Sequence, residues 1–119
     1  MDIRLSRAYD EPGPDDGQRV LVDRVWPRGR KRETLHLDAW MREVGPSDEL
    51  RHWFGHEPER WPEFRRRYRA ELAAPPRAEL VDELAARAQR GRLTLVFGAA
   101  DRERNQAMVL AELLRERLA

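Results

Sequence analysis

Cysteine is absent from the 119 residues of this chain. This absence excludes disulfide bonds, thiolate nucleophiles, zinc sites with cysteine ligands and iron–sulfur clusters, because each of these needs a cysteine sulfur. Long apolar runs are missing as well: no apolar region follows the N-terminus, and no stretch approaches the roughly 18 residues that cross a membrane. We therefore expect a cytoplasmic protein that has no membrane partner.

Lysine is nearly absent, because Lys31 is the only one and arginine supplies the rest of the positive charge. Basic and acidic residues nearly balance, at 23 against 22. This balance excludes a global electrostatic field that would draw the chain onto nucleic acid or an anionic membrane. Charged residues make up 38% of the chain, against roughly 25% in an average soluble domain. The surface must therefore be densely ionic, and any anion-binding site must be local.

Short apolar runs predict about four β-strands. A continuous run of aliphatic and β-branched residues is typical of a strand covered on both faces, as in a parallel sheet, whereas strict alternation indicates one exposed face. The continuous pattern occurs at residues 20–22 and 93–97, and the alternating pattern at residues 3–5 and 34–40. Residues 10–17, with two prolines, two glycines and four acids, are predicted to form a loop.

Apolar side chains at helical spacing predict about four helices in the remainder of the chain. Ser47 is expected to cap the first helix and Gly55 to end it, and the second helix is expected at about residues 62–72. A third helix is expected to end at Gly91, and Asp101 is expected to cap the last one. A helix, strand, helix order requires a crossover connection and hence parallel neighbouring strands.

The predicted fold class is α/β: one compact domain over residues 1–119, with a small, mainly parallel sheet of about four strands flanked by about four helices. Open parallel sheets bind ligands beyond the carboxyl ends of their strands. The two buried strands lead into the segments Asp23–Arg28 and Gly98–Asn105. If these strands are parallel neighbours, both segments lie at the same edge of the sheet and form one candidate site.

The segment after the first buried strand combines a carboxylate, guanidinium groups and an indole. Asp23 and Arg24 would supply a general base and a planar anion-binding group, or else an internal salt bridge that anchors the next loop. Arg28, with the cations at 30–32 and the amides at the start of the last helix, would hold a phosphate or carboxylate, unless the charges are merely solvated. Trp26 is predicted to be partly exposed, where it would stack on a base or sugar.

Two of the three histidines are further candidates. If residues 34–40 form a strand, His36 and Asp38 project from the same face with Cα atoms roughly 6.5–7 Å apart. This spacing suits a hydrogen-bonded pair, an acid–base couple or two ligands of one metal, with His56 as a third ligand. The alternative is that His36 is a surface residue and that His56 caps the carbonyl groups of the preceding helix.

A basic helix offers a second kind of surface. Four of its residues are arginines, at positions 65, 66, 67 and 69, and they would bind nucleic acid. The alternative is a solvated helix surface, because Glu63 and Arg67 form an i, i+4 pair and the neighbouring aromatic side chains are needed in the core.

The sequence also resembles a known family, domain-of-unknown-function family 488, in its YeaO-like branch. The resemblance extends from Ile3 to about Leu114 and rests on residues 20–29 (VLVDRVWPRG), 37–40 (LDAW), 46–47 with 50–51, 53–56 (WFGH), and Asp101 with Asn105. It implies a small α/β fold in bacterial cytosol and no established activity. Where the family commonly reads His-Asn-His, this chain has Arg104-Asn105-Gln106. A metal or acid–base role for those two imidazoles is therefore not expected here.

These observations together predict a small anionic ligand, nucleotide-like or phosphate-like, at the carboxyl edge of the sheet. The expected ligand-binding residues are Arg24, Trp26, Arg28, Asp101 and Asn105. If the protein is an enzyme, the expected reaction groups are Asp23, Asp38 and His56. His36, Asp38 and His56 form the alternative metal site, and the sequence leaves the cofactor unknown. The alternative function is a non-catalytic nucleic-acid or protein interaction module that uses the helix of Arg65–Arg69.

Overall fold

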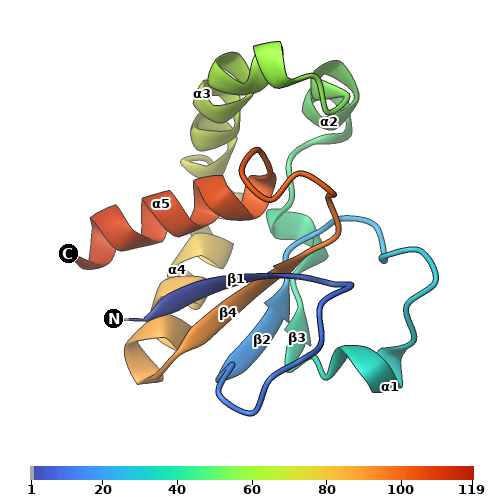
Figure 1. Cartoon of the computed structure of the whole chain (residues 1–119). Coiled ribbons are helices and arrows are strands. Elements are labelled where there is room, and N and C mark those ends of the chain that lie inside the picture. Colours follow the sequence, from blue (N-terminus) through green and yellow to red (C-terminus); the bar gives the residue numbers. More distant parts are fainter. Residues whose placement is uncertain (1) are drawn as a thin grey trace.

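A computed structural model describes residues 2–119, and it contains one sheet of four parallel strands (Figure 1). The strand order is β1-β4-β2-β3. The strands are β1 (Ile3–Arg7), β2 (Gln18–Leu21), β3 (Ala39–Trp40) and β4 (Leu93–Phe97). The helices are α1 (Arg32–Leu35), α2 (Asp48–Phe54), α3 (Trp61–Leu72), α4 (Arg77–Arg90) and α5 (Gln106–Leu118), with short 3-10 helices η1 (Arg42–Val44) and η2 (Pro58–Arg60). The predicted α/β class with a parallel sheet is confirmed.

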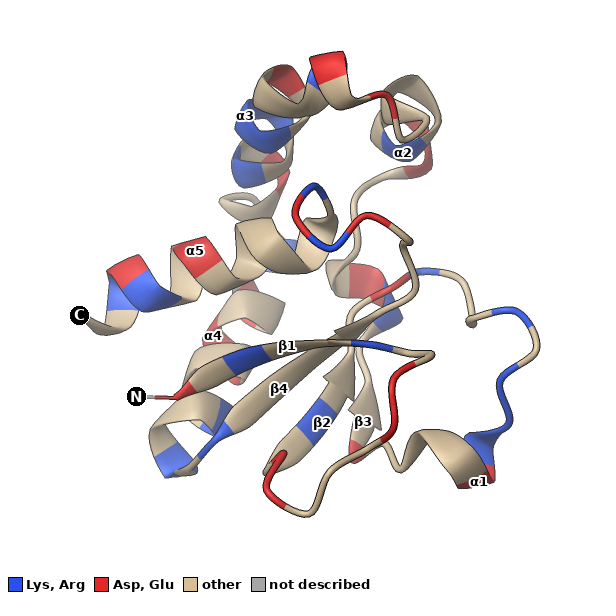
Figure 2. Ribbon diagram, in the orientation of Figure 1, with Lys and Arg blue, Asp and Glu red and all other residues tan. Residues whose placement is uncertain are grey.

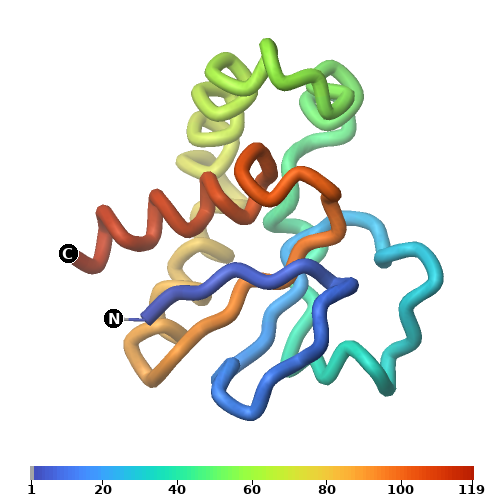
Figure 3. Tube along the Cα trace, viewed as in Figure 1, coloured from blue at the N-terminus to red at the C-terminus, as the bar shows by residue number. Residues whose placement is uncertain are grey.

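β4 lies between β1 and β2, so the chain passes from one side of β4 to the other immediately after its first strand. Parallel pairing aligns Leu5 with Leu95 on one side of β4 and Val20 with Leu95 on the other. The connection is the predicted loop, which returns to the start of β2 without a helix (Figure 3). At its end Gly17 adopts φ 67°, and a Cβ there would lie 2.3 Å from the carbonyl oxygen of Arg92. Only glycine fits this close approach at a left-handed position.

Apolar side chains cover both faces of the sheet. Alternation along each strand sends one set of residues toward α3, α4 and α5, and the other set toward the segment that contains α1 (Figure 1). The larger core includes Val20, Val22, Leu95, Phe97, Tyr68, Leu84 and Leu110. The smaller core consists of Ala8, Leu21, Leu35 and Val96, with Trp26, Leu37 and Trp40 packed against it. Burial on both faces is why the two central strands read as continuous apolar runs. No helix within residues 2–119 is long and apolar enough to span a bilayer.

The prediction of one strand over residues 34–40 is wrong. A helical turn, α1, occupies Arg32–Leu35 and ends at His36 in the left-handed conformation, with φ 50°. Only Ala39 and Trp40 pair with β2. Leu35 and Leu37 both reach the smaller core, one from the helical turn and the other from the link that follows, so their alternation imitates a strand.

The helix predictions are confirmed except at the start of α5. The Ser47 hydroxyl accepts a hydrogen bond from the Leu50 amide at 3.2 Å, and Gly55 ends α2 with φ 52°. Asp101 does not cap α5, because its carboxylate accepts hydrogen bonds from the Glu103 and Arg104 amides in the turn before the helix. Asn105 is the cap, and its side-chain oxygen accepts from the Met108 amide at 3.0 Å. Both residues are good cap formers, and the turn at Asp101 delays the start of the helix by one turn.

Candidate functional site

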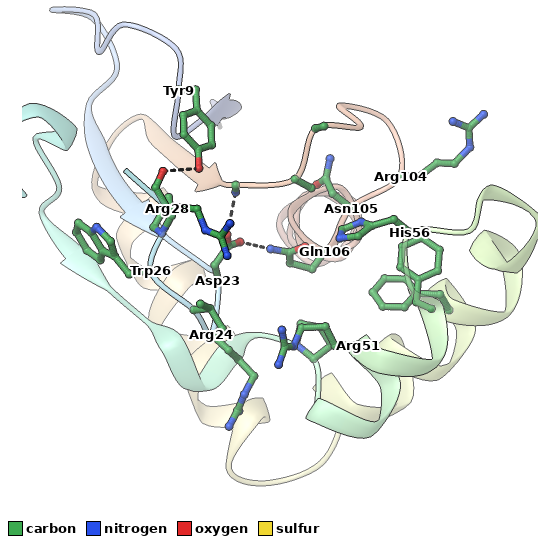
Figure 4. A pocket seen from close by; sticks show the side chains of 18 residues that line it. Tyr9, Asp23, Arg24, Trp26, Arg28, Arg51, His56, Arg104, Asn105 and Gln106 are labelled. Carbon is green, nitrogen blue, oxygen red and sulfur yellow. Dashed lines mark hydrogen bonds between the residues drawn. The ribbon is translucent and has the colours of Figure 1, made fainter. Parts of the chain in front are cut away.

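A cavity of about 420 Å³ lies at the carboxyl edge of the sheet (Figure 4). Its walls come from residues 23–28 after β2, from residues 98–100 and 104–106 after β4, from Tyr9 after β1, and from α2 and α3. β2 and β4 are parallel neighbours, so the two segments that the sequence singles out face each other at one edge, as expected. The volume falls within the range of about 300–1,000 Å³ that small-molecule sites occupy.

Asp23 connects both sides of this cavity. One carboxylate oxygen accepts the Gly98 amide at 2.8 Å, and the other accepts the side-chain amide of Gln106, the first residue of α5. A Cβ at position 98 would lie 2.8 Å from the same carboxylate oxygen, so only glycine allows this contact. The main-chain carbonyl of Asp23 also accepts the indole N–H of Trp40 at 2.7 Å. Asp23 therefore joins the ends of β2, β3 and β4 to the start of α5.

Burial of the Asp23 carboxylate raises its pKa to about 6, from an ordinary value of 3.8. The hydrogen bond from Gly98 and the positive charge of Arg51 oppose this rise but do not cancel it. Within residues 2–119, no arginine or lysine forms an ion pair with Asp23. The carboxyl group is therefore present in both protonation states near neutral pH, which lets it donate or accept a hydrogen bond.

Arg24 is engaged on the outer side of the site. Its guanidinium lies 3.7 Å from Glu43 and 3.5 Å from Asp48, and Figure 4 shows its side chain directed away from the centre of the cavity. Gly45 makes room for this side chain, because a Cβ at position 45 would lie 2.7 Å from the Arg24 Cγ. The salt-bridge interpretation of Arg24 therefore describes its geometry better than a free anion-binding group does.

Arg28 and Arg51 bring positive charge to two sides of the cavity (Figure 4). Arg28 is exposed, and its carbonyl accepts the Tyr9 hydroxyl at 2.9 Å. The guanidinium of Arg28 pairs with no carboxylate in the described part of the chain. Arg51 pairs with Asp48 at 3.1 Å, an exposed contact between successive turns of α2. Arg28 is therefore the cavity cation that is most available to a ligand.

Aromatic side chains line much of the remaining wall. Trp26 is half-buried, as predicted, because its indole N–H donates to the Arg30 carbonyl at 2.7 Å and its ring packs edge-on against Trp40. On the opposite side Phe54 stacks on Phe64 with ring centroids 4.3 Å apart. His56 lines the same side with φ 59°, and its ring lies 6.1 Å from that of Phe54. The cavity therefore combines a polar floor with apolar sides.

Three of the predicted residues lie elsewhere. Asp38 precedes β3 at the amino edge of the sheet, where its carboxylate accepts the Arg19 amide at 2.8 Å. Asp101 does not line the cavity, and its carboxylate binds the amides of Glu103 and Arg104. His36 ends α1 and does not line the cavity either. No group of three or more metal-binding side chains occurs within residues 2–119, and the structure does not bring His36, Asp38 and His56 together. Asn105 lines the cavity, but its side chain caps α5.

The cavity also contains residues that were not singled out from the sequence. Tyr9 arrives from the first loop, Arg51 from α2, and Gln106 from the start of α5. Arg51 lies inside one of the motifs that carry the family resemblance, and Gln106 occupies one of the two positions where an imidazole is expected. Tyr9 has no comparable signal, because only the strand order brings β1 next to β4 and hence to this edge.

The arginines of α3 all meet carboxylates. Arg65 and Arg69 pair with Glu112 on α5, and Arg69 also pairs with Glu116. Arg66 and Arg67 both pair with Glu63, one turn earlier on the same helix. This helix surface is therefore close to neutral, which weighs against the nucleic-acid role considered for it.

Residues 2–119 match a family model that is described as the inactive DUF488-N3 subclade. The chain belongs to the DUF488 family. It is similar to the uncharacterized protein YeaO of Escherichia coli K12, with 44% identity over 115 residues, which cover 97% of this chain and 98% of YeaO. It is also similar to the uncharacterized protein Rv3073c of Mycobacterium tuberculosis H37Rv, with 42% identity over 115 residues, covering 97% and 95% of the two chains. No solved structure matches at a significant level. The YeaO-like resemblance is thus confirmed.

Proposed function

We propose that this DUF488 protein binds a small anionic ligand, phosphate-like or nucleotide-like, in the cavity at the carboxyl edge of its sheet, and does not convert it chemically. The observation that carries the proposal is the charge arrangement of the cavity. It contains a guanidinium that pairs with no carboxylate in residues 2–119, Arg28, and a buried carboxyl group that pairs with no cation there, Asp23.

Arg28 and Arg51 hold the anionic group from two sides, because planar guanidinium groups donate paired hydrogen bonds to phosphate or carboxylate oxygens. Asp23 takes a hydrogen bond from a polar group of the same ligand, since Gly98 and Gln106 occupy only part of its accepting capacity. The apolar portion of the ligand lies against Trp26 and the stacked ring of Phe54. A few polar groups within an apolar wall are typical of small-molecule sites.

Binding without conversion is supported by the description of the matching family model as inactive. The two positions of the expected imidazoles hold Arg104 and Gln106. Arg104 pairs with Asp101 at 3.0 Å, and Gln106 donates to Asp23. Neither a guanidinium nor an amide changes its protonation state near neutral pH, so neither replaces a histidine in acid–base chemistry.

Acid–base catalysis by Asp23 with His56 is a second candidate. It is favoured by the raised pKa of Asp23, about 6, because general acids and bases work best when their pKa lies near the operating pH. Incubation of the protein with a nucleotide or sugar phosphate that it binds, with the products separated by chromatography, distinguishes the two candidates. Loss of that conversion in Asp23→Asn would establish catalysis, whereas a ligand recovered unchanged supports binding alone.

Thermal unfolding in the presence of inorganic phosphate, nucleoside monophosphates, sugar phosphates and small carboxylates tests the binding proposal. A ligand at 100 times its Kd stabilises the folded state by about 2.7 kcal/mol, which raises Tm measurably. Arg28→Ala should abolish the increase. Arg90→Ala removes an exposed arginine at the end of α4, outside the cavity, and should retain it. If no anion raises Tm, or if the two variants respond alike, the proposal fails.

A further inference from the structure

Four cations, from the wall of the cavity to the first residue of α1, are unusual in this molecule because their side chains lack partners. They are Arg28, Arg30, Lys31 and Arg32, and we call them the basic segment. Elsewhere in residues 2–119 every arginine except Arg90 either pairs with a carboxylate or donates to a main-chain carbonyl. The positive charge of the basic segment is therefore not neutralised by the chain itself.

The basic segment is held in a defined conformation. The Arg28 carbonyl accepts from Tyr9, the Arg30 carbonyl accepts from Trp26 at 2.7 Å, and the Lys31 carbonyl accepts the Thr34 hydroxyl at 2.9 Å. The Arg30 amide also donates to the Pro27 carbonyl at 3.3 Å. These contacts use main-chain atoms of the segment and leave its cationic ends free. The Nε atom of Arg30 is buried and has no hydrogen-bond partner among the described residues, as is also true of the Nε atom of Arg69.

The basic segment begins at the cavity and leads away from it. Arg28 lines the cavity, and Figure 2 shows positive residues along the outer course of the chain from there to α1. Exposed apolar surface lies at the same place. Among the described residues, the exposed large hydrophobic side chains are Tyr9 and Val25, at 43% and 57%, and both line the cavity. Cations next to exposed aromatic and apolar side chains are typical of surfaces that bind single-stranded nucleic acid.

We propose that the cavity accepts one nucleotide of a single-stranded nucleic acid, while the phosphates next to that nucleotide lie along the basic segment. This inference rests on the proposed binding of an anion in the cavity. A base within a duplex is stacked and paired, and so it enters a cavity only when it is already single-stranded or is turned out of the helix. The basic segment carries enough positive charge to contact several phosphates. A free mononucleotide has too few phosphates to contact all of these cations.

Fluorescence anisotropy with a labelled thymidine oligonucleotide tests this inference, at a length of about ten nucleotides, within the usual site size of about 4–16. The test variant is Arg30→Ala/Lys31→Ala/Arg32→Ala, which keeps Arg28. The matched control removes three exposed cations from α3, α4 and α5, in Arg66→Ala/Arg90→Ala/Arg117→Ala.

The unmodified protein should bind the oligonucleotide with an affinity that falls as salt rises. Each phosphate contact contributes about 0.7 to the logarithmic slope for single strands, so the test variant should lower that slope by about 2 and weaken binding at least about tenfold. The control variant should bind within about twofold of the unmodified protein. The Tm increase with thymidine monophosphate should persist in the test variant and disappear in Arg28→Ala.

Other results overturn the inference in ways that identify the error. If thymidine monophosphate raises Tm but the oligonucleotide binds no more tightly, the cavity ligand is a free small molecule and the anion-binding proposal stands. Equal loss of affinity in the test and control variants removes the role of the basic segment. Oligonucleotide binding that survives Arg28→Ala removes the role of the cavity. Binding to phosphatidylserine vesicles in place of the oligonucleotide assigns the segment to a membrane surface. If no anion of any kind binds, both proposals fail.

Discussion

The two edges of the sheet differ in how completely their charged side chains are paired. At the amino edge, Arg19 pairs with Asp16 at 2.6 Å and Arg92 pairs with Asp2 at 2.6 Å. At the carboxyl edge, Asp23 has no cation and Arg28 has no carboxylate among the described residues. Charges that hold the amino edge together have their partners inside the chain. The proposed ligand supplies the partners of Asp23 and Arg28 at the carboxyl edge.

The same contrast separates the two arginine-rich segments. Those of α3 meet Glu63, Glu112 and Glu116, whereas those of the basic segment meet no carboxylate within residues 2–119. Each segment contains four cations when read from the sequence. What differs is which acids the fold brings within reach, and that determines which segment is available to an external anion.

The largest expected effect on stability comes from breaking an ion pair at the amino edge. Asp16→Ala removes the carboxylate from Arg19, whose side chain is buried and whose second terminal nitrogen already lacks a partner. Leaving one charge of a buried pair without its partner costs about 3–5 kcal/mol, so the free energy of unfolding in urea should fall by about 3 kcal/mol. The exposed neighbour Asp15→Ala should change it by less than about 0.5 kcal/mol. If Asp16→Ala lowers the free energy of unfolding no more than Asp15→Ala does, Arg19 does not depend on Asp16 for its partner.

The next prediction concerns Asp23, whose pKa is raised to about 6 in the folded protein. The folded state therefore binds this proton more tightly than the unfolded state, so the contribution to stability is complete below about pH 4 and is lost as pH rises through 6. From the difference of 6 and 3.8, the loss is about 3 kcal/mol. Asp23→Asn remains neutral, and Gln106 can turn its amide to meet the new side chain.

Urea unfolding of Asp23→Asn should therefore match the unmodified protein near pH 4 and exceed its free energy of unfolding progressively up to pH 7.5. Asp38→Asn, at the amino edge, also removes one negative charge and serves as the control. A difference that stays constant from pH 4 to 7.5 would contradict the assigned burial of Asp23, because only a titrating group makes the difference depend on pH.

A smaller effect is expected when the partners of α3 are removed. Glu112→Gln separates Arg65 and Arg69 from one of their carboxylates, in contacts that are partly exposed. Such pairs contribute about 0.2–1 kcal/mol each, so the free energy of unfolding should fall by about 1 kcal/mol or less. The freed arginines should also increase salt-dependent binding to oligonucleotides. No increase would show that unpaired charge alone does not make a binding surface.

The smallest effect on stability is expected for Arg28→Ala. Its guanidinium is exposed and pairs with no carboxylate in the described chain, so the free energy of unfolding should change by less than about 0.5 kcal/mol. Its Tm should nevertheless cease to respond to the anion that stabilises the unmodified protein. If Arg28→Ala lowers the free energy of unfolding in the absence of ligand, Arg28 has a structural role and the contrast between the two edges is weaker.

Local patterns in the sequence were sufficient for most of the elements. The continuous apolar runs at residues 20–22 and 93–97 predicted two central parallel strands, and helical spacing predicted α2, α3 and α4. The rule that parallel sheets carry sites at their carboxyl edge then placed Asp23 and Arg28 together. These predictions succeed because strand and helix periodicity depends on neighbours along the chain.

Tertiary structure alone decided the rest. Leu35 and Leu37 pack in the smaller core from a helical turn and the link after it, although their alternation predicted a strand. The strand order brings Tyr9 to the cavity. Arg65 meets Glu112 from 47 positions away, and Asp23 meets Gln106 from 83. Pairing and burial of charges depend on such distant contacts. The sequence therefore indicates where a site lies, whereas only the fold determines which of its charges remain available to a ligand.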